Sequence, residues 1–297
     1  MKKTAFVAIV GRPNVGKSTL LNKMLGEKVS IVSSKPQTTR SRITGILTRG
    51  EEQYVFLDTP GIHKPRTKLG DYMVKSAEGS MVGCDAAILV AEADKPAGEI
   101  ETSIIGRLNR AGTPIILALN KIDRSDPESI AKSITSYAEI SDYAAVVPIS
   151  ALKGRGVDEV LDETSKLLHE GEWFFPDGEI TDMPERTYSA EIIREKLLRL
   201  LNEEIPHGTA VVVEEFKENK SRVSIRAEIY CERETHKKII IGHGGEMIKK
   251  IGQYAREDLE EFFGVPVYVD LWVKVKENWR DRGGFLKDFG YDPKNLV

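Results

Sequence analysis

The chain has 297 residues, 40% of them hydrophobic and 30% charged, and a formal net charge of −3. This length favours two domains with ordinary buried cores, and the near-neutral charge does not by itself indicate a nucleic-acid binder. No apolar run reaches the ~18 residues that cross a bilayer, and two cysteines exclude a disulfide framework and favour a reducing cytoplasm.

The first 170 residues alternate apolar runs with helix-length segments. We predict strands at 6–10, 42–48, 54–58, 86–92, 114–120 and 145–150, and helices at 99–111, 127–141 and 156–169. This alternation indicates a parallel sheet covered on both faces. The connection RGEEQ between the second and third strands is too short for a crossover, so this pair is predicted to be antiparallel. The expected fold is an α/β domain with a mostly parallel six-stranded sheet and helices on both faces.

A phosphate-binding loop follows the first predicted strand. The segment GRPNVGKS matches the pattern G-x-x-x-x-G-K-[ST] and opens a helical run. Backbone N–H groups at such a helix start bind anions. Lys17 is predicted to neutralise β- and γ-phosphate oxygens, and the Ser18 hydroxyl to bind Mg²⁺. We expect the nucleotide to contact Gly11, Arg12, Pro13, Asn14, Val15, Gly16, Lys17, Ser18 and Thr19.

An acidic residue ends the third strand, in YVFLDTPG. Asp58 is predicted to hold Mg²⁺ through a water, and the Gly61 N–H to sense the γ-phosphate. Thr59 and Pro60, which lie between them, are predicted to be nucleotide contacts as well.

A guanine-recognition pattern follows the fifth strand, in NKID. The Asp123 carboxylate can accept hydrogen bonds from the guanine N1–H and 2-amino group, which adenine lacks, so GTP is favoured over ATP. The Ala151 N–H of ISA can donate to the guanine O6. The predicted base contacts are Asn120, Lys121, Asp123, Ser150 and Ala151.

The pattern changes after residue 170. We predict a G-type domain at 1–170, a linker rich in proline, glycine and acidic residues at 171–187, and a second domain at 188–297. The second domain is expected to contain a helix at 189–205, strands at 209–217 and 221–232, a helical THKKIII, a helix at 246–263 and a strand at 266–275. This α-β-β-α-α-β order predicts a compact α+β unit.

A Gly-x-x-Gly loop separates the last two predicted helices. By itself this pattern indicates no more than a helix break. The order of elements around it resembles a type II KH domain, whose glycine loop clamps the backbone of a single-stranded nucleic acid. The resemblance and the local charge predict RNA contacts at Gly242, His243, Gly244, Gly245, Lys237, Lys238, Lys249, Lys250, Arg280 and Arg282.

The motifs GRPNVGKS, DTPG, NKID and ISA resemble the G1, G3, G4 and G5 boxes of translation-factor-class GTPases. Together with QTTR they resemble the TrmE–Era branch, and one such domain followed by one type II KH domain, in about this length, resembles the Era family. The resemblance implies Mg²⁺-dependent hydrolysis of GTP to GDP, with Lys17, Thr39 and Gly61 as catalytic residues. It implies Ser18, Thr39 and Asp58 as the magnesium site, Thr38 being the alternative to Thr39.

The means of positioning the attacking water stays open at this stage. The usual glutamine after the D-x-x-G turn is replaced by Ile62, and His63 is either a substitute or a solvated loop residue. The resemblance also implies that Asn14 holds a K⁺ ion in the role of an arginine finger. Slow unassisted hydrolysis is expected, which suits a switch.

The resemblance further implies a monomer that acts in the cytoplasm on the small (30S) ribosomal subunit, with the KH domain on the 3′ end of 16S rRNA. It implies peripheral association with the cytoplasmic face of the inner membrane. Two other functions stay open: an RNA-binding module with a nucleotide-sensing G domain, in which hydrolysis is incidental, and an ATP-using kinase or ATPase, against which NKID argues. Residues 62–75 are expected to reorder with GTP and to affect the second domain.

Overall fold

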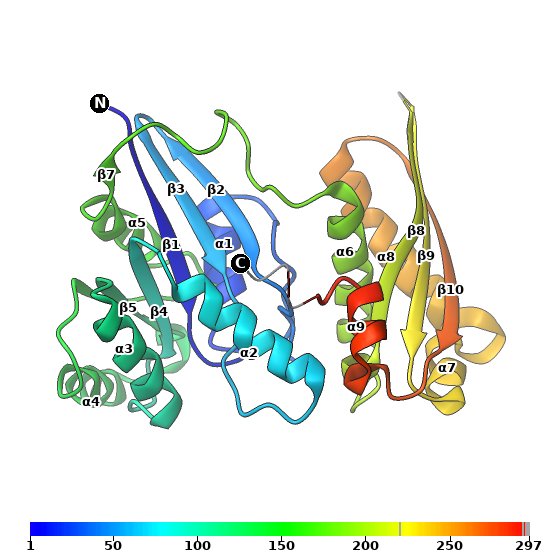
Figure 1. Ribbon diagram of the computed structural model, residues 1–297, viewed down its shortest axis with the longest axis horizontal. Helices are drawn as coiled ribbons and strands as arrows, with labels where there is room; N and C mark the ends of the chain where they lie inside the picture. The colour runs from blue at the N-terminus through cyan, green and yellow to red at the C-terminus, as the bar shows by residue number, and fades with distance from the viewer. Residues whose placement is uncertain (220, 293, 295–297) are drawn as a thin grey trace. The chain divides into compact units, whose positions relative to one another are not determined.

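The computed structural model describes residues 1–219, 221–292 and 294. Its contacts divide the chain into two compact units (Figure 1). The first is built mainly from Met1–Pro65 and Gly70–Asp182, and the second mainly from the chain after Asp182 together with Arg66–Leu69. The division after Asp182 falls inside the stretch 171–187 that composition marks as a linker.

The first unit contains a sheet in the order β2-β3-β1-β4-β5-β6. The β2–β3 pair is antiparallel and the other neighbours are parallel, as predicted. A two-residue strand, β7 at His169–Glu170, pairs antiparallel with the start of β1, and sequence patterns did not predict it. The main strands are β1 at Lys3–Val10, β2 at Ile43–Arg49, β3 at Glu52–Asp58, β4 at Ala86–Glu92, β5 at Ile115–Asn120 and β6 at Ala145–Pro148.

Helices cover both faces of this sheet (Figure 1). One face forms a core in which Met81 of α2, Ile104 of α3 and Tyr137 of α4 pack against residues of β1, β4 and β5. The helices α1 and α5 contact each other; α1 also contacts β1, β2 and β3, and α5 also contacts β5 and β6. The bounds are α1 at Lys17–Leu25, α2 at Lys68–Met81, α3 at Glu99–Ala111, α4 at Pro127–Ala138 and α5 at Val157–Ser165.

The stretch predicted as a linker pairs with β2, the edge strand of the sheet. The Ile46 N–H donates to the Ile180 carbonyl at 2.9 Å, and the Thr181 hydroxyl donates to the Thr44 carbonyl at 2.7 Å. The Thr44 hydroxyl in turn donates to Asp182 Oδ2 at 3.2 Å. Residues 180 and 181 therefore satisfy backbone groups that an open edge strand would leave exposed, and Asp182 adds a side-chain contact.

The second unit follows the predicted α-β-β-α-α-β order. Its sheet has the order β10-β9-β8, with β8 antiparallel and β10 parallel to β9. The first helix begins at Glu185, four residues before the predicted start, and ends at Leu200. The elements are α6 at Glu185–Leu200, β8 at Ala210–Asn219, β9 at Arg222–Cys231, α7 at Glu234–Ile241, α8 at Glu246–Phe263 and β10 at Val267–Val275.

A short helix near the C-terminus, α9 at Gly283–Asp288, was not predicted, because two glycines open it. It is held by aromatic packing: the Phe289 ring stacks on Tyr230 at 4.5 Å between ring centroids. Trp279 just before it is fully buried and donates its indole N–H to the Gly208 carbonyl. Among the described residues, no helix is both long and apolar enough to cross a membrane.

Candidate functional site

The predicted phosphate loop connects β1 to α1. Gly11 has φ of 146°, and a β-carbon built on it would lie 2.3 Å from the Val90 carbonyl oxygen, so only glycine fits. Inside the loop, Lys17 Nζ donates to the carbonyls of Gly11 at 3.2 Å and Arg12 at 2.8 Å. Burial lowers the pKa of Lys17 to about 8, although the charge of Asp58 opposes the shift.

Three oxygen-bearing side chains meet below the loop. Ser18 Oγ lies 2.6 Å from Asp58 Oδ2 and 2.9 Å from Thr39 Oγ1. Thr38 faces elsewhere, since its hydroxyl donates to the Lys35 carbonyl at 2.7 Å. The structure therefore brings Thr39, and not Thr38, to Ser18.

The buried carboxylate of this group fits a magnesium site. Asp58 is fully buried, and its Oδ1 has no hydrogen-bond partner within the described part of the chain. Burial raises the pKa of Asp58, against the opposing charge of Lys17 and hydrogen bonds that include that of Ser18. Mg²⁺ prefers oxygen ligands. This group offers two hydroxyls and a carboxylate whose Oδ1 has no other partner in the described part of the chain.

The residues of the guanine pattern are joined by one side chain. Asn120 Nδ2 donates to the Val15 carbonyl of the phosphate loop at 2.7 Å, and Asn120 Oδ1 accepts from the Ala151 N–H at 2.9 Å. Asp123 accepts from the Ser150 hydroxyl at 2.6 Å, and this bond is the largest cause of the lowered pKa of Asp123. Asn120 is 105 residues from Val15 and 31 residues from Ala151 in the sequence. Its two hydrogen bonds therefore join three distant motifs into one site.

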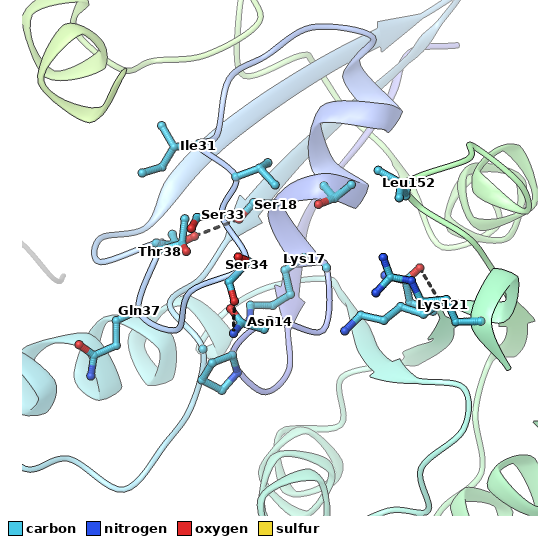
Figure 2. A pocket seen from close by; sticks show the side chains of 18 of the residues that line it. Asn14, Lys17, Ser18, Ile31, Ser33, Ser34, Gln37, Thr38, Lys121 and Leu152 are labelled. Carbon is cyan, nitrogen blue, oxygen red and sulfur yellow. Dashed lines mark hydrogen bonds between the residues drawn. The ribbon is translucent and has the colours of Figure 1, made fainter. Parts of the chain in front are cut away.

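A cavity of about 470 Å³ lies among the phosphate loop, the Thr39 segment and the guanine pattern (Figure 2). This volume is in the usual range for small-molecule sites. The predicted residues that line it are Pro13, Asn14, Gly16, Lys17, Ser18, Thr19, Thr39, Gly61, Asn120, Lys121 and Asp123. The other predicted contacts, Gly11, Arg12, Val15, Asp58, Thr59, Pro60, Ser150 and Ala151, are not among the described lining residues.

Sequence patterns missed part of the cavity wall. In the segment between α1 and β2, the sequence predicted a role only for Thr39 of QTTR, with Thr38 as its alternative. Asn14 Nδ2 holds this segment by donating to the Ser34 carbonyl at 2.9 Å (Figure 2). Lys121 Nζ pairs with Glu92, at the end of β4. No motif spacing connects these positions. The lining residues that were not predicted are Ile31, Val32, Ser33, Ser34, Gln37, Arg124 and Leu152, and Thr38, predicted only as the alternative magnesium ligand, lines the cavity as well.

In the turn after Asp58, the side chains of Ile62 and His63, the two residues discussed above for positioning the attacking water, lie in different surroundings. Ile62 packs against the hydrophobic core. His63 Nδ1 lies 3.0 Å from the Gly61 carbonyl, and its Nε2 lies 3.3 Å from Gln37 Nε2, on the segment that carries Thr39. His63 therefore connects the two loops that meet at the cavity.

The second glycine loop joins α7 to α8. Gly242, Gly244 and Gly245 have φ of 74°, 55° and 83°, so the turn uses the left-handed conformation that glycine favours. A β-carbon on Gly242 would lie 2.8 Å from Met247, whereas Gly244 and Gly245 have no atom within 4 Å of that position. Gly242 shapes the turn, and the other two leave open backbone.

A groove of about 430 Å³ runs between α8 and β10, starting in the first turn of α8. The sequence predicted Lys249 as an RNA contact at this face, and the other lining residues were not predicted as RNA contacts. The described lining residues are Ile248, Lys249, Gly252, Gln253, Arg256, Val267, Tyr268, Val269 and Leu271.

The two arginines predicted on the RNA face make contacts within the chain. Arg280 Nη2 forms an ion pair with Glu232 at 2.6 Å, and the Arg280 side chain is only 24% exposed. The Arg282 guanidinium lies over the Phe285 ring, 5.8 Å from its centroid. Both support the packing around α9, a role that the count of basic residues did not predict.

Comparisons with known proteins agree with this architecture. Residues 6–121 match the family described as 50S ribosome-binding GTPase, and residues 204–280 match the KH domain family. The GTPase Era of Clostridium kluyveri is 50% identical over 292 residues, which cover 98% of this chain and 100% of that relative.

Two solved structures are similar over nearly the whole chain. A variant of Aquifex aeolicus Era bound to GDP and AlF₄⁻ has a TM-score of 0.93 at 41% identity, covering 98% of this chain and 99% of that one. An Era in complex with MgGDPNP and nucleotides 1506–1542 of 16S ribosomal RNA has a TM-score of 0.92 at 42% identity, covering 98% and 100%. The chain is therefore a GTPase of the Era family, with a P-loop GTPase domain followed by a KH domain.

Proposed function

We propose that this GTPase is a nucleotide-controlled switch that binds the 3′ end of 16S rRNA and acts in assembly of the 30S subunit. The observation that carries the proposal is the open glycine loop, with the α8–β10 groove starting at the next helix. Support comes from the 42% identical Era that was solved with nucleotides 1506–1542 of 16S ribosomal RNA.

In the proposed hydrolytic site, the backbone of the phosphate loop and Lys17 hold the phosphates, and Ser18, Thr39 and Asp58 hold Mg²⁺. When bound, Mg²⁺ neutralises charge on the β- and γ-phosphate oxygens. Gly61 lets the turn after β3 approach the phosphate loop, because a β-carbon there would lie 2.6 Å from the backbone of Pro13. Its N–H is thereby available to the γ-phosphate.

Potassium activation is part of the proposal. Asn14 has φ of 63°, and its Nδ2 is engaged with Ser34, which leaves Oδ1 as the atom for K⁺. We expect faster turnover in K⁺ than in Na⁺ buffer, and loss of that difference in Asn14→Ala. Equal rates of phosphate release in the two salts would refute this part.

The RNA-binding role is tested at Gly244. Gly244→Asp places a carboxylate in open space on the loop, where it repels a phosphodiester, while the turn can still form. We expect loss of binding to a 16S rRNA 3′-end oligonucleotide and unchanged GTP hydrolysis. The matched control is Gly264→Asp, at another open glycine, which has φ of 67° and ends α8.

Binding of the control variant should equal that of the unchanged protein. If Gly244→Asp binds the oligonucleotide normally, or if Gly264→Asp loses binding equally, the loop is not the RNA site.

An RNA-binding module in which hydrolysis is incidental is the competing function. Lys17→Ala would lose nucleotide binding as well as phosphate release, so its failure to support 30S assembly fits both functions. Repeated rounds of 30S assembly with GTP but not with a non-hydrolysable GTP analogue would support the switch. If Lys17→Ala supports assembly fully, hydrolysis is incidental and the switch is refuted.

We also propose, from the family, that the protein is a monomer acting in the cytoplasm, with peripheral association with the cytoplasmic face of the inner membrane. Light scattering of the purified protein tests the first point. Cell fractionation with a salt wash tests the second: release of the protein from membranes by salt is the expected result, and retention after the wash contradicts it.

A further inference from the structure

A buried serine contacts the carboxylate of the magnesium site from outside the known motifs. Ser30 is fully buried, and its hydroxyl donates to Asp58 Oδ2 at 2.9 Å. It lies between α1 and β2 and is not among the described residues that line the nucleotide cavity. Ser30 therefore reaches Asp58 without occupying the space of the nucleotide.

The backbone around Ser30 is fixed by one side chain of α1. Asn22 Oδ1 accepts from the N–H groups of Val29 at 3.1 Å and Ser30 at 2.9 Å. Asn22 Nδ2 donates to the Ser30 carbonyl at 2.7 Å. Three hydrogen bonds from a helix that begins at the phosphate loop thus set the position of the Ser30 hydroxyl.

This arrangement uses one oxygen of Asp58 and not the other. Oδ2 accepts from both Ser18 and Ser30, whereas Oδ1 has no partner in the described ranges of the chain. A carboxylate can rotate about its last bond with little preference between two orientations. Two donors on one oxygen remove that freedom and leave the second oxygen for a ligand.

The same bond stabilises the charge of Asp58. Burial raises the pKa of this carboxyl, and the hydrogen bond from Ser30 is one of the interactions that oppose the rise. A hydrogen bond to the ionised form favours that form. Without Ser30, Asp58 would be less well oriented.

We propose that Ser30, held by Asn22, is a positioning residue of the magnesium site, which fixes the orientation of the Asp58 carboxylate that would hold the Mg²⁺ accompanying the nucleotide. The inference rests on the proposed magnesium role of Asp58. Groups that orient metal ligands in this way typically account for roughly 10- to 100-fold in metal affinity.

The test measures GDP affinity with Mg²⁺ and with EDTA, by fluorescence of a labelled GDP, so that no hydrolysis is involved. In Ser30→Ala we expect the gain in affinity that Mg²⁺ provides to fall roughly 10- to 100-fold, with GDP affinity in EDTA unchanged. Ser133→Ala is the matched control, because its hydroxyl is buried too but donates only to the Lys95 carbonyl.

Two further variants separate positioning from a structural effect. Asn22→Ala should reduce the Mg²⁺-dependent gain in the same direction, because it releases the Ser30 backbone. In an Asp58→Ala background, Ser30→Ala should cause no further loss, since Ser30 acts through Asp58. Thermal unfolding of every variant establishes that it is folded.

The outcomes distinguish this inference from the site on which it rests. If Asp58→Ala loses the Mg²⁺-dependent gain but Ser30→Ala keeps it, the positioning role is refuted and the proposed site stands. If Asp58→Ala also keeps the gain, both fail. A loss of GDP affinity in EDTA equal to that in Mg²⁺ would show that Ser30 has only a structural role.

Discussion

At the scale of single residues, the buried ammonium of Lys17 leads us to expect proton uptake when GTP binds. The pKa of Lys17 is about 8 because burial disfavours the charged form. Phosphate oxygens placed beside it raise that pKa again. Near pH 8 we therefore expect binding of GTP to take up roughly 0.5 proton, measured by calorimetry in buffers of different ionisation enthalpy.

The lowered pKa of Lys17 sets the direction in which pH changes GTP affinity and folding stability. GTP affinity should fall as pH rises above 8, because Lys17 must be recharged before it can pair with phosphate. For folding, the lowered pKa destabilises the native state fully below pH 8, and this effect is relieved as pH rises from about 8 toward the unfolded value of 10.5.

Two variants test whether Lys17 takes up the proton. Lys17→Met should take up no proton when GTP binds, and Lys23→Met should behave as the unchanged protein. Equal proton uptake in both variants would contradict the assignment of the proton to Lys17.

Asp123 is the residue expected to recognise the guanine base. The Ser150 hydroxyl holds one oxygen of Asp123 and helps to keep its pKa low, so a charged acceptor faces the guanine edge. Asp123→Asn should lower GTP affinity by roughly 100-fold, since a charged pair of hydrogen bonds is lost. It should raise affinity for the xanthine nucleotide, whose ring has a carbonyl in place of the 2-amino group.

Competition binding with the two nucleotides measures this change of preference. The control is Asp126→Asn, which alters the same type of side chain at the N-cap of α4 and keeps a capping residue. If Asp123→Asn keeps its preference for GTP, the carboxylate does not read the base.

Residues in fixed motifs were predictable, and their supporting partners were not. The positions of Lys17, Asp58 and Asp123 follow from spacing on a strand-loop-helix pattern, because the chemistry demands those residue types there. The Ser30–Asp58 contact spans 28 residues across an irregular segment, and no periodicity encodes it. Burial of a polar side chain becomes visible only in three dimensions.

At the scale of elements, the segment 180–182 acts as an extra edge partner for β2. We predict that Thr181→Val, which loses the hydrogen bond to the Thr44 carbonyl, weakens this pairing by about 1 kcal/mol. Protection of the Ile46 amide from hydrogen exchange should fall about fivefold, because its acceptor is the Ile180 carbonyl.

The amide of Ile46 reports the local opening directly, so unfolding of the whole chain is not needed. Thr102→Val serves as the control, since its exposed hydroxyl donates to the carbonyl of Gly98, the N-cap of α3. Unchanged protection of Ile46 in Thr181→Val would show that the segment does not stabilise the edge.

Elements with a strong pattern were predicted nearly to the residue, and weak ones were missed. The strand β4 at Ala86–Glu92 and the helix α8 at Glu246–Phe263 coincide with the predicted ranges, because each has a long apolar run or a clear helical period. The six-residue α9 and the two-residue β7 have neither. They form because tertiary contacts, such as the Phe289–Tyr230 stack, outweigh weak local preference.

At the scale of the whole molecule, the chain places nucleotide chemistry in one unit and the glycine loop in the other. The sequence predicted this division of labour, since each loop lies in a different pattern of elements. It could not predict the pairing of the linker with β2, because residues 171–187 have no strand or helix period. That pairing gives the covalent connection between the units a defined anchor.

The anchor leads to a prediction about coupling. Thr44, which is hydrogen-bonded to Thr181 and Asp182, lies only five residues after Thr39, the proposed magnesium ligand. The helix α6 of the second unit begins at Glu185, three residues after Asp182. A change in the Thr39 segment on GTP binding would alter β2, the linker and the start of α6 in turn. We therefore expect affinity for the 16S rRNA 3′ end to differ between the GDP state and the state with a non-hydrolysable GTP analogue, with residues 62–75 reordering as well.

Thr44→Val tests this route, because it removes the hydroxyl that bonds Asp182 and retains the strand residue. RNA affinity measured in both nucleotide states should become more nearly equal in this variant, while affinity for each nucleotide stays unchanged. Thr48→Val, on the same strand but bonded to Gln53, is the control and should keep the difference. Identical RNA affinities in the two states of the unchanged protein would refute coupling altogether, and a full difference retained in Thr44→Val would place the coupling in 62–75 and not in the linker.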